Sequence, residues 1–208
     1  MPRTAFWDRI APKYARQPIR DVKSYEYTLG RTRSYLGAQD RVLELGCGTG
    51  GTAVLLAGGV ERYTATDVSP GMIAEANARQ TPENLGFVTA GWSEPRLLDR
   101  EYDAVLAFNL LHLLPDLPTV LRRVNTLLEP GGVFISKTTV APAADAPLWF
   151  PLLRIALPVL RLFGRVPWVA FRPAAEHDAM IEAAGFRIIE TFDGTGHVPA
   201  RFVVARKL

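Results

Sequence analysis

The chain has 208 residues, a formal net charge of +3, 48% hydrophobic residues and 22% charged residues. This length suits a single domain with a sizeable core, and the small net charge gives no basis for nucleic-acid binding. The lone cysteine, Cys47, excludes an intrachain disulfide and a Cys-based zinc site, and we predict no metal centre. No stretch has the character of a signal peptide or a membrane span, so we expect a cytoplasmic protein.

The first 38 residues have the pattern of amphipathic helices. Apolar or aromatic side chains recur at Val22, Tyr25 and Leu29, and Gly37 is the predicted stop. From residue 41 onward, short apolar runs typical of strands alternate with helix-like segments. The predicted strands are 41–45, 62–67, 85–90, 102–108 and 132–139, and the predicted helices are 50–58, 70–79 and 117–128. This alternation predicts an α/β fold with a mainly parallel sheet.

The end of the chain departs from this alternation. Residues 185–192 and 199–208 flank a turn-rich link, which predicts two antiparallel strands at the edge of the sheet. Before them, residues 140–173 form a Pro-rich, apolar stretch without a clear strand or helix period. We therefore predict one domain, 1–208, with a helical segment at 1–38 and an insertion at 140–173.

The loop VLELGCGTGG, residues 42–51, follows the first predicted strand and fits two glycine patterns. One is the dinucleotide fingerprint G-x-G-x-x-G, carried by Gly46, Gly48 and Gly51. The other is E-x-G-x-G-x-G, which begins at Glu44 and ends at Gly50. Both patterns place a ligand against the backbone of a strand–loop–helix turn. The glycines alone do not decide which kind of ligand the loop binds.

Two carboxylates bear on the choice of ligand. Asp67 ends the second predicted strand, where it can accept hydrogen bonds from two ribose hydroxyls in either pattern. Glu44 would repel a pyrophosphate but would attract a cationic amino group. S-adenosylmethionine carries an ammonium and no phosphate, so Glu44 favours it. An oxidoreductase is further disfavoured because no tyrosine has a lysine four residues later and a second domain has no room.

Several stretches together resemble the class I S-adenosylmethionine-dependent methyltransferases of the small-molecule type. They are FWDRIAPKY, VLELGCGTG, YTATDVSPGMIAEA, YDAVLAFNLLHLLPD and LLEPGGVFISKTT, and they cover nearly the whole chain in order. The resemblance implies a Rossmann-like seven-stranded sheet whose last strand is antiparallel, with helices on both faces. It also implies S-adenosyl-L-methionine as cofactor, lid helices within 1–38 and a helical substrate cap within 140–173.

The resemblance assigns cofactor-binding positions along three strand ends. These positions are Glu44, Gly46, Cys47, Gly48 and Gly50 at the loop, Asp67 at the ribose, Val68, Met72, Gly91 and Trp92 around the adenine, and Asn109 and Leu110 near the donor methyl. Gly91 stands where the family usually has an aspartate, so stacking on Trp92 would replace that contact. Ordinary core packing is the alternative for Val68 and Met72. For Asp67 the alternative is a helix cap, although Ser69 suits that role better.

Catalytic and substrate positions are fewer. His112 is the best general-base candidate because the ordinary pKa of histidine lies near neutrality, and its alternative is packing against the next helix. Tyr14 would close over the cofactor from the lid. Trp7, Trp149 and Phe150 are predicted to line the substrate pocket. Because the sulfonium is already electrophilic, proximity and orientation can supply most of the rate, and a base is needed only for a protonated acceptor.

The apolar stretch 146–171 bears on the acceptor. If this stretch is helical, Arg154, Arg161 and Arg165 share one face and apolar side chains cover the rest. Such an element can be a substrate cap, a contact with a membrane surface or an oligomer interface. The first two favour an apolar acceptor.

We therefore expect methyl transfer to a small apolar acceptor by direct in-line displacement. Two alternatives stay open: a membrane-associated enzyme that methylates a phospholipid amine or a quinone precursor, and a non-catalytic, cofactor-binding partner subunit. The expected partner is a small apolar substrate and no nucleic acid, with peripheral contact to the inner face of a membrane through 146–171 as an open option. The oligomeric state is not predicted.

Overall fold

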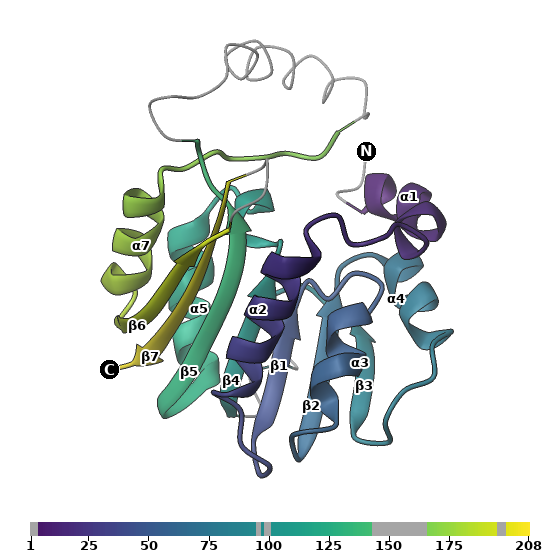
Figure 1. The fold of residues 1–208 in the computed structure, drawn as a ribbon, viewed down its shortest axis with the longest axis horizontal. Coiled ribbons are helices and arrows are strands. Elements are labelled where there is room, and N and C mark those ends of the chain that lie inside the picture. Colours follow the sequence, from purple (N-terminus) through teal and green to yellow (C-terminus); the bar gives the residue numbers. More distant parts are fainter. Residues whose placement is uncertain (1–3, 95–96, 98–100, 143–165, 195–198) are drawn as a thin grey trace.

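The computed structural model describes residues 4–94, 97, 101–142, 166–194 and 199–208. Its centre is a seven-stranded sheet in the order β3-β2-β1-β4-β5-β7-β6 (Figure 1). The strands are β1 (Arg41–Leu45), β2 (Arg62–Asp67), β3 (Leu85–Thr89), β4 (Tyr102–Phe108), β5 (Leu128–Thr139), β6 (Phe186–Asp193) and β7 (Ala200–Lys207). The predicted seven-stranded α/β fold is confirmed, and β1, β2 and β4 have the predicted bounds.

The order of the strands creates a crevice. Strands β1 to β5 are parallel, and the chain runs outward from β1 through β2 to β3 before it returns to β4 on the other side of β1. In such sheets, ligands bind at the carboxyl ends of the strands beside this reversal. The antiparallel ending is also confirmed, with one refinement: β7 inserts between β5 and β6, so β6 forms the edge.

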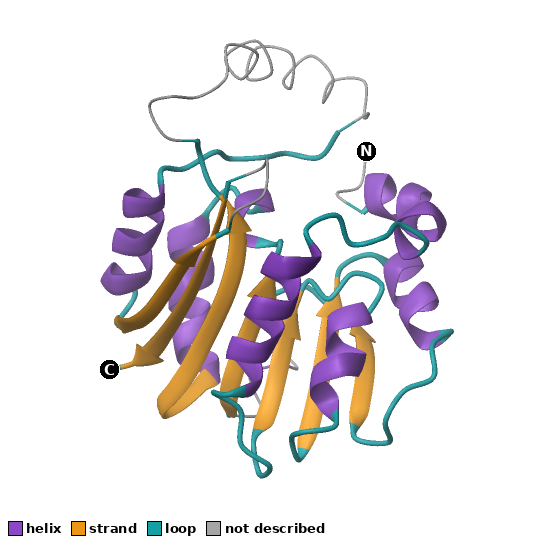
Figure 2. Cartoon of the chain, viewed as in Figure 1, coloured by secondary structure: helices purple, strands orange, loops and turns teal. Residues whose placement is uncertain are grey.

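Helices cover both faces of the sheet (Figure 2). They are α1 (Ala5–Ala15), α2 (Val22–Arg33), α3 (Gly51–Ala57), α4 (Pro70–Asn77), the short η2 (Leu111–Leu113), α5 (Leu117–Leu127) and α7 (Ala174–Ala183). One face packs on α2 and α3, and the other packs on α5 and α7. Helix α7 was not predicted. Among the described residues, no helix combines the length and the apolarity that crossing a membrane requires.

The central strands are buried on both faces, which explains their nearly continuous apolar sequences. In β4, residues Ala104, Val105, Leu106 and Ala107 are all 0% exposed. The two clusters that flank the sheet share no residue, because successive side chains of a strand point to opposite faces. A rigid central sheet therefore supports the loops at its carboxyl edge.

Helix α2 packs only in part by the predicted stripe, of which Leu29 contacts the core. The sequence pattern places Val22 in the buried stripe, yet Val22 is 49% exposed and the buried residues are Ser24, Thr28 and Thr32. The threonine hydroxyls donate to main-chain carbonyls of the preceding turn, Thr28 to Ser24 at 2.9 Å and Thr32 to Thr28 at 2.7 Å. Because their hydrogen bonds are satisfied within the helix, these small side chains can be buried and let α2 approach the sheet closely.

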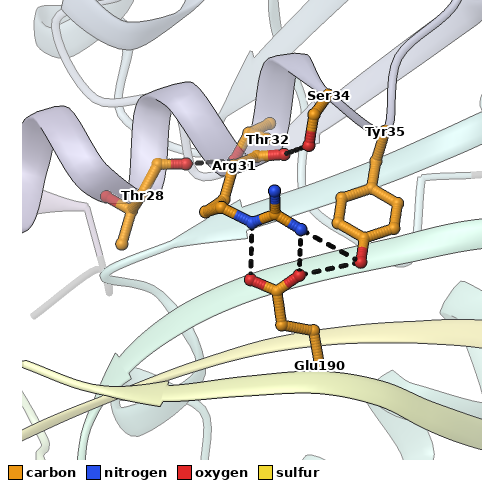
Figure 3. A network of polar contacts seen from close by, with 6 residues as sticks. All are labelled: Thr28, Arg31, Thr32, Ser34, Tyr35 and Glu190. Atoms are coloured by element: carbon orange, nitrogen blue, oxygen red, sulfur yellow. Dashed lines mark hydrogen bonds and ion pairs between the residues drawn. The ribbon is translucent and has the colours of Figure 1, made fainter.

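A polar network fastens the end of α2 to the edge strand β6 (Figure 3). The Nε of Arg31 donates to Oε1 of Glu190 at 2.7 Å, and Nη2 of Arg31 donates to the other carboxylate oxygen. The hydroxyl of Tyr35 donates to that second oxygen at 2.8 Å. The Arg31 side chain is 39% exposed, so solvent screens the charges and the fork geometry mainly sets orientation. The helix ends at Arg33, one turn before the predicted stop at Gly37.

Candidate functional site

A cleft of about 1670 Å³ opens at the carboxyl ends of the parallel strands, below α1. Most of the predicted site residues line it: Trp7, Tyr14, Glu44, Gly46, Cys47, Gly48, Asp67, Val68, Met72, Gly91, Trp92, Asn109 and Leu110. Gly50 and His112 do not line it. Trp149 and Phe150 lie outside the described residues, as does most of the stretch 146–171. The sequence-predicted positions thus converge on one cleft.

The glycine loop between β1 and α3 adopts backbone conformations that favour glycine. The φ angles are +70° at Gly46, +55° at Gly48 and +74° at Gly50. A Cβ on Gly46 would lie 2.8 Å from Cδ1 of Leu110, whereas a Cβ on Gly48 would meet nothing closer than Tyr14 at 3.9 Å. Gly48 therefore leaves an open face on the cleft, where a ligand can approach the main chain.

Gly50 has a packing role that the predicted cofactor role does not include. It is the left-handed N-cap of α3, and a Cβ there would lie 2.5 Å from Cζ of Phe87 and 3.0 Å from Cβ of Ala76. These side chains belong to the elements behind the loop, not to the cleft. The prediction that Gly50 meets the ligand is therefore corrected: it lets the loop turn tightly over Phe87.

Asp67 organises the loop from the end of β2. Its Oδ2 accepts from the main-chain N of Gly48 at 2.9 Å, and its Oδ1 accepts from the N of Ser69 at 2.8 Å. Ser69 is the N-cap of α4 and accepts from the N of Met72 at 3.1 Å. The helix-cap role thus belongs to Ser69, and Asp67 keeps lone pairs on the cleft side. Burial raises the pKa of Asp67, and the two main-chain donors oppose this effect.

Glu44 is a buried carboxyl group at the base of the loop. It is 2% exposed, and its Oε2 accepts from the hydroxyl of Tyr63 at 2.9 Å. Burial raises the pKa of Glu44 to about 7, and the nearby charge of Asp67 adds to this effect. A cationic group bound beside the loop would favour the ionised form of Glu44, whereas a phosphate would oppose it. A carboxyl group at the base of the loop therefore suits the ammonium of an amino acid better than a pyrophosphate.

Replacing Glu44 with glutamine is expected to remove a pH-dependent loss of stability. The folded pKa of about 7 exceeds the ordinary 4.5, so between these pH values the folded chain holds a proton that the unfolded chain has lost. The contribution of Glu44 to the free energy of unfolding is therefore largest below pH 4.5. It decreases by about 3 kcal/mol as the pH rises to 7. Urea unfolding across this range would measure the difference between the variant and the natural chain.

We expect the stability difference in favour of Glu44→Gln to grow as pH rises, because glutamine still accepts from Tyr63 but cannot ionise. The exposed Glu61→Gln serves as the control and should leave the pH profile unchanged. A stability difference for Glu44→Gln that stays constant with pH would contradict the raised pKa of this carboxyl group.

Helix α1, the predicted lid, packs against the N-terminus of α4, as their neighbouring positions in Figure 1 indicate. Oδ1 of Asp8 accepts from Oγ of Ser69 at 2.5 Å and from the N of Gly71 at 3.0 Å. A Cβ on Gly71 would lie 3.0 Å from Cα of Asp8, so the two helices approach closely. Further along α1, burial and the charge of Asp67 raise the pKa of Tyr14. The Asp8 contacts, a latch between α1 and α4, thus hold Tyr14 over the glycine loop.

Replacing Asp8 with alanine is expected to loosen this lid. The variant loses two hydrogen bonds that join α1 to α4, so bound S-adenosylhomocysteine should dissociate faster and bind roughly fivefold more weakly. Stopped-flow fluorescence would give the dissociation rate. Asp8→Asn is the matched control, because both bonds go to one oxygen, Oδ1, and the amide oxygen of asparagine can accept both. An unchanged dissociation rate in Asp8→Ala would contradict the latch.

The region predicted for the adenine has the expected surfaces. Val68 lines the cleft and is 44% exposed, so core packing does not explain it, whereas Met72 reaches the cleft from a position only 2% exposed. A Cβ on Gly91 would already lie 3.3 Å from Cγ1 of Val68, which leaves little room there for an aspartate. Trp92 lines the cleft beside them and also packs on the core.

At the end of β4 the backbone takes an unusual turn. Asn109 has φ +54°, the one positive φ of a non-glycine residue in the described part of the chain, and its N donates to the carbonyl of Lys137 at 2.7 Å. Asparagine tolerates this region better than most residues, and such conformations cluster at functional sites. The turn brings Asn109 and Leu110 to the cleft wall.

His112 does not reach the cleft wall, contrary to the prediction of a general base. Its Nδ1 lies 3.0 Å from Oγ1 of Thr138, and that same hydroxyl oxygen accepts from the main-chain N of His112 at 3.0 Å. Burial, aided by the charge of Arg172, lowers the pKa of His112 to about 4. A group with this pKa is a weak base at neutral pH. The packing alternative therefore describes His112 better.

Several residues that line the cleft were not predicted. They are Asp21 and Tyr25 on the α2 side and Lys137 near the end of β5, whereas Val166, Pro167 and Trp168 fall within the predicted cap, 140–173, but were not named individually. Lys137 could have been found by the rule that pointed to Asn109, because it pairs with the last residue of β4, Phe108, near the end of the neighbouring parallel strand. The described residues contain no group of three or more His, Cys, Asp or Glu side chains that could hold a metal ion.

The geometry defines an α/β protein with a cleft beside a glycine loop at the carboxyl ends of its parallel strands, and comparison with known proteins narrows the class. Residues 42–132 match the family model of a methyltransferase domain. The chain is 36% identical over 111 residues to the fatty-acid O-methyltransferase of Mycolicibacterium smegmatis, an alignment that covers 52% of this chain and 40% of that protein. It is 31% identical over 168 residues to a hybrid PKS-NRPS synthetase of Macrophomina phaseolina, which covers 73% of this chain and 4% of that protein.

The chain thus spans less than half the length of these two relatives. Among solved structures, an S-adenosylmethionine-dependent methyltransferase from Mesorhizobium loti has a TM-score of 0.68 at 19% identity, over 88% of this chain and 98% of that chain. At such low identity this likeness shows the shared fold. Residues 42–132 thus match a methyltransferase domain, the fold is that of S-adenosylmethionine-dependent methyltransferases, and S-adenosylmethionine is the cofactor that these likenesses imply for the cleft.

Proposed function

We propose that the chain transfers a methyl group from S-adenosylmethionine to a small, apolar acceptor that binds in the same cleft. The size of the cleft carries this proposal. Its volume of about 1670 Å³ exceeds the roughly 300–1,000 Å³ that hold one drug-sized ligand, so it has room for a cofactor and an acceptor together. The fatty-acid O-methyltransferase relative, by its name, acts on an apolar molecule.

The lining of the cleft supports an apolar acceptor. Beyond the glycine loop, the walls carry Leu113 and Leu114 at η2, and Val166 and Trp168 from the described end of the insertion 140–173. Across the cleft, Trp7 and its ring neighbour Phe6 extend the apolar surface of α1, with ring centroids 5.0 Å apart. Apolar side chains that line a cavity gain free energy when an apolar ligand displaces water from them.

When bound, S-adenosylmethionine supplies an electrophilic methyl group on its sulfonium. The chain's own residues then have three tasks. Asp67 holds the ribose, Gly48 leaves room for the amino-acid end, α1 and Tyr14 exclude water from above, and Asn109 with Leu110 shapes the passage to the acceptor. Positioning two reactants in line can supply most of the rate without a proton-transfer group, which agrees with the retracted position of His112.

The test is an acceptor screen. Purified chain with S-adenosylmethionine would be incubated with apolar acids, phenols, quinols and amines, and with a polar amino acid and a basic peptide. We expect S-adenosylhomocysteine and a methylated apolar product, both detected by mass spectrometry. Methylation of only the peptide or the polar amino acid would contradict the proposal. Tight cofactor binding with no methylated product from any acceptor would favour a non-catalytic partner subunit instead.

A further inference from the structure

The cleft is lined by a lysine, Lys137, to which the predicted cofactor site assigns no role. Lys137 is the last residue of β5 to pair with β4, opposite Phe108, and it lines the cleft beside Asn109. We propose that Lys137 binds the carboxylate of an apolar acid, and that this carboxylate is the methyl acceptor. The inference rests on the proposed function and gives its acceptor a chemical class.

The position of Lys137 suits an acceptor. The carbonyl of Lys137 accepts from the main-chain N of Asn109 at 2.7 Å, so its backbone adjoins the turn that passes the predicted donor methyl. The Nζ donates to Oγ of Ser24 at 3.1 Å, which draws the ammonium to the α2 side of the cleft. Ser24 is itself only 3% exposed. Lys137 thus has a defined place next to the β4 turn.

The ammonium has unused binding capacity. It carries three donors, and Ser24 takes one. Within the described part of the chain, no carboxylate lies close enough to Lys137 to form an ion pair, although the more distant charge of Asp21 acts on it. Burial lowers the pKa of Lys137, because the charged ammonium loses hydration that no nearby carboxylate replaces. A bound carboxylate would supply that compensation with a charge-assisted hydrogen bond.

A carboxylate acceptor also matches the chemistry of the site. An alcohol, a phenol or an ammonium must lose a proton on or before methylation, and the predicted base, His112, contacts Thr138 and is not among the residues that line the cleft. A carboxylate arrives already ionised. Its oxygen forms the new O–CH₃ bond while the sulfur–methyl bond breaks, and the electron pair of that bond stays on sulfur. No proton moves, and the products are a methyl ester and S-adenosylhomocysteine.

Calorimetric titration of the chain saturated with S-adenosylhomocysteine tests this role separately from activity. The probes are decanoate and naphthoate, each paired with its neutral counterpart, decanol or naphthol. We expect at least one acid to bind more tightly than its neutral partner, and Lys137→Met to weaken acid binding roughly tenfold or more while neutral binding stays unchanged. Lys137→Arg should restore part of the acid affinity. Lys23→Met, on the exposed side of α2, is the control and should change nothing.

Three outcomes would overturn the inference. They are acids that bind no better than their neutral partners, acid affinity that survives in Lys137→Met, and a loss in Lys137→Met that affects acids and neutral probes equally. Binding of S-adenosylhomocysteine separates this failure from that of the proposed function. If the chain and its variants bind that ligand normally, only the carboxylate acceptor is refuted. If the natural chain does not bind it at all, the proposed function fails together with the inference.

Discussion

Replacing Asp67 with alanine is expected to weaken the binding of S-adenosylhomocysteine by roughly 100-fold or more, because about 3 kcal/mol of charge-assisted hydrogen bonding to the ribose is lost. The variant also loses both main-chain contacts of this carboxylate. Without the 2.9 Å bond to the N of Gly48, the loop no longer holds its open face toward the ligand. Isothermal titration calorimetry would measure the effect directly.

Two further variants show whether the loss of affinity is specific to the Asp67 carboxylate. Asp67→Asn keeps the shape and one acceptor oxygen, so its affinity should fall between those of the natural chain and Asp67→Ala. Asp103→Ala removes a carboxylate at the start of β4, where it accepts from the N of Arg41 at 2.8 Å, far along the strand from the cleft. We expect that control to bind normally. Natural affinity in a folded Asp67→Ala variant would refute the ribose role.

Replacing Gly50 with alanine is expected to destabilise the chain by roughly 2–5 kcal/mol, through left-handed backbone strain and overpacking together. The φ angle at Gly50 is +74°, and the new Cβ would lie 2.5 Å from Cζ of Phe87. The ring of Phe87 is packed against the core on the α2 and α3 face, so it has little freedom to move. Urea unfolding monitored by circular dichroism would give the change in free energy.

The adjacent glycine provides the matched control. Gly51 begins α3, has no positive φ, and a Cβ there would meet nothing within 4 Å. Gly51→Ala should therefore be neutral or stabilise the helix by up to about 1 kcal/mol. Similar losses for both alanine variants would contradict the assignment of Gly50 as the position that packing and backbone geometry restrict.

The sheet was predictable because its signals are local. Runs such as 41–45 and 102–108 are apolar at successive positions, as expected for strands buried on both faces. Helix α7 was missed because its sequence, AAEHDAMIEA, has a weak apolar stripe and buries only His177 and Ile181. The buried polar residues of α2 were missed because Thr28 and Thr32 satisfy their hydroxyls within the helix, which hydrophobic periodicity does not register.

The site was predictable where it depends on residues close in sequence. Gly48 and Asp67 lie on adjacent strand ends, and motif spacing was enough to bring them together. His112 was misplaced because its ring orientation depends on Thr138, which comes from a different strand. Likewise, the role of Gly50 depends on Phe87 in β3, and the latch of Asp8 depends on α4. Such long-range side-chain contacts arise only from the packed tertiary structure.

The most direct test of the cofactor assignment is a calorimetric titration of the natural chain with S-adenosylmethionine, S-adenosylhomocysteine and NADH. The buried carboxyl of Glu44 beside the glycine loop predicts micromolar binding of both adenosyl ligands and no measurable binding of NADH. Binding of NADH, or of none of the three, would contradict the assignment of the cleft to a methyl donor.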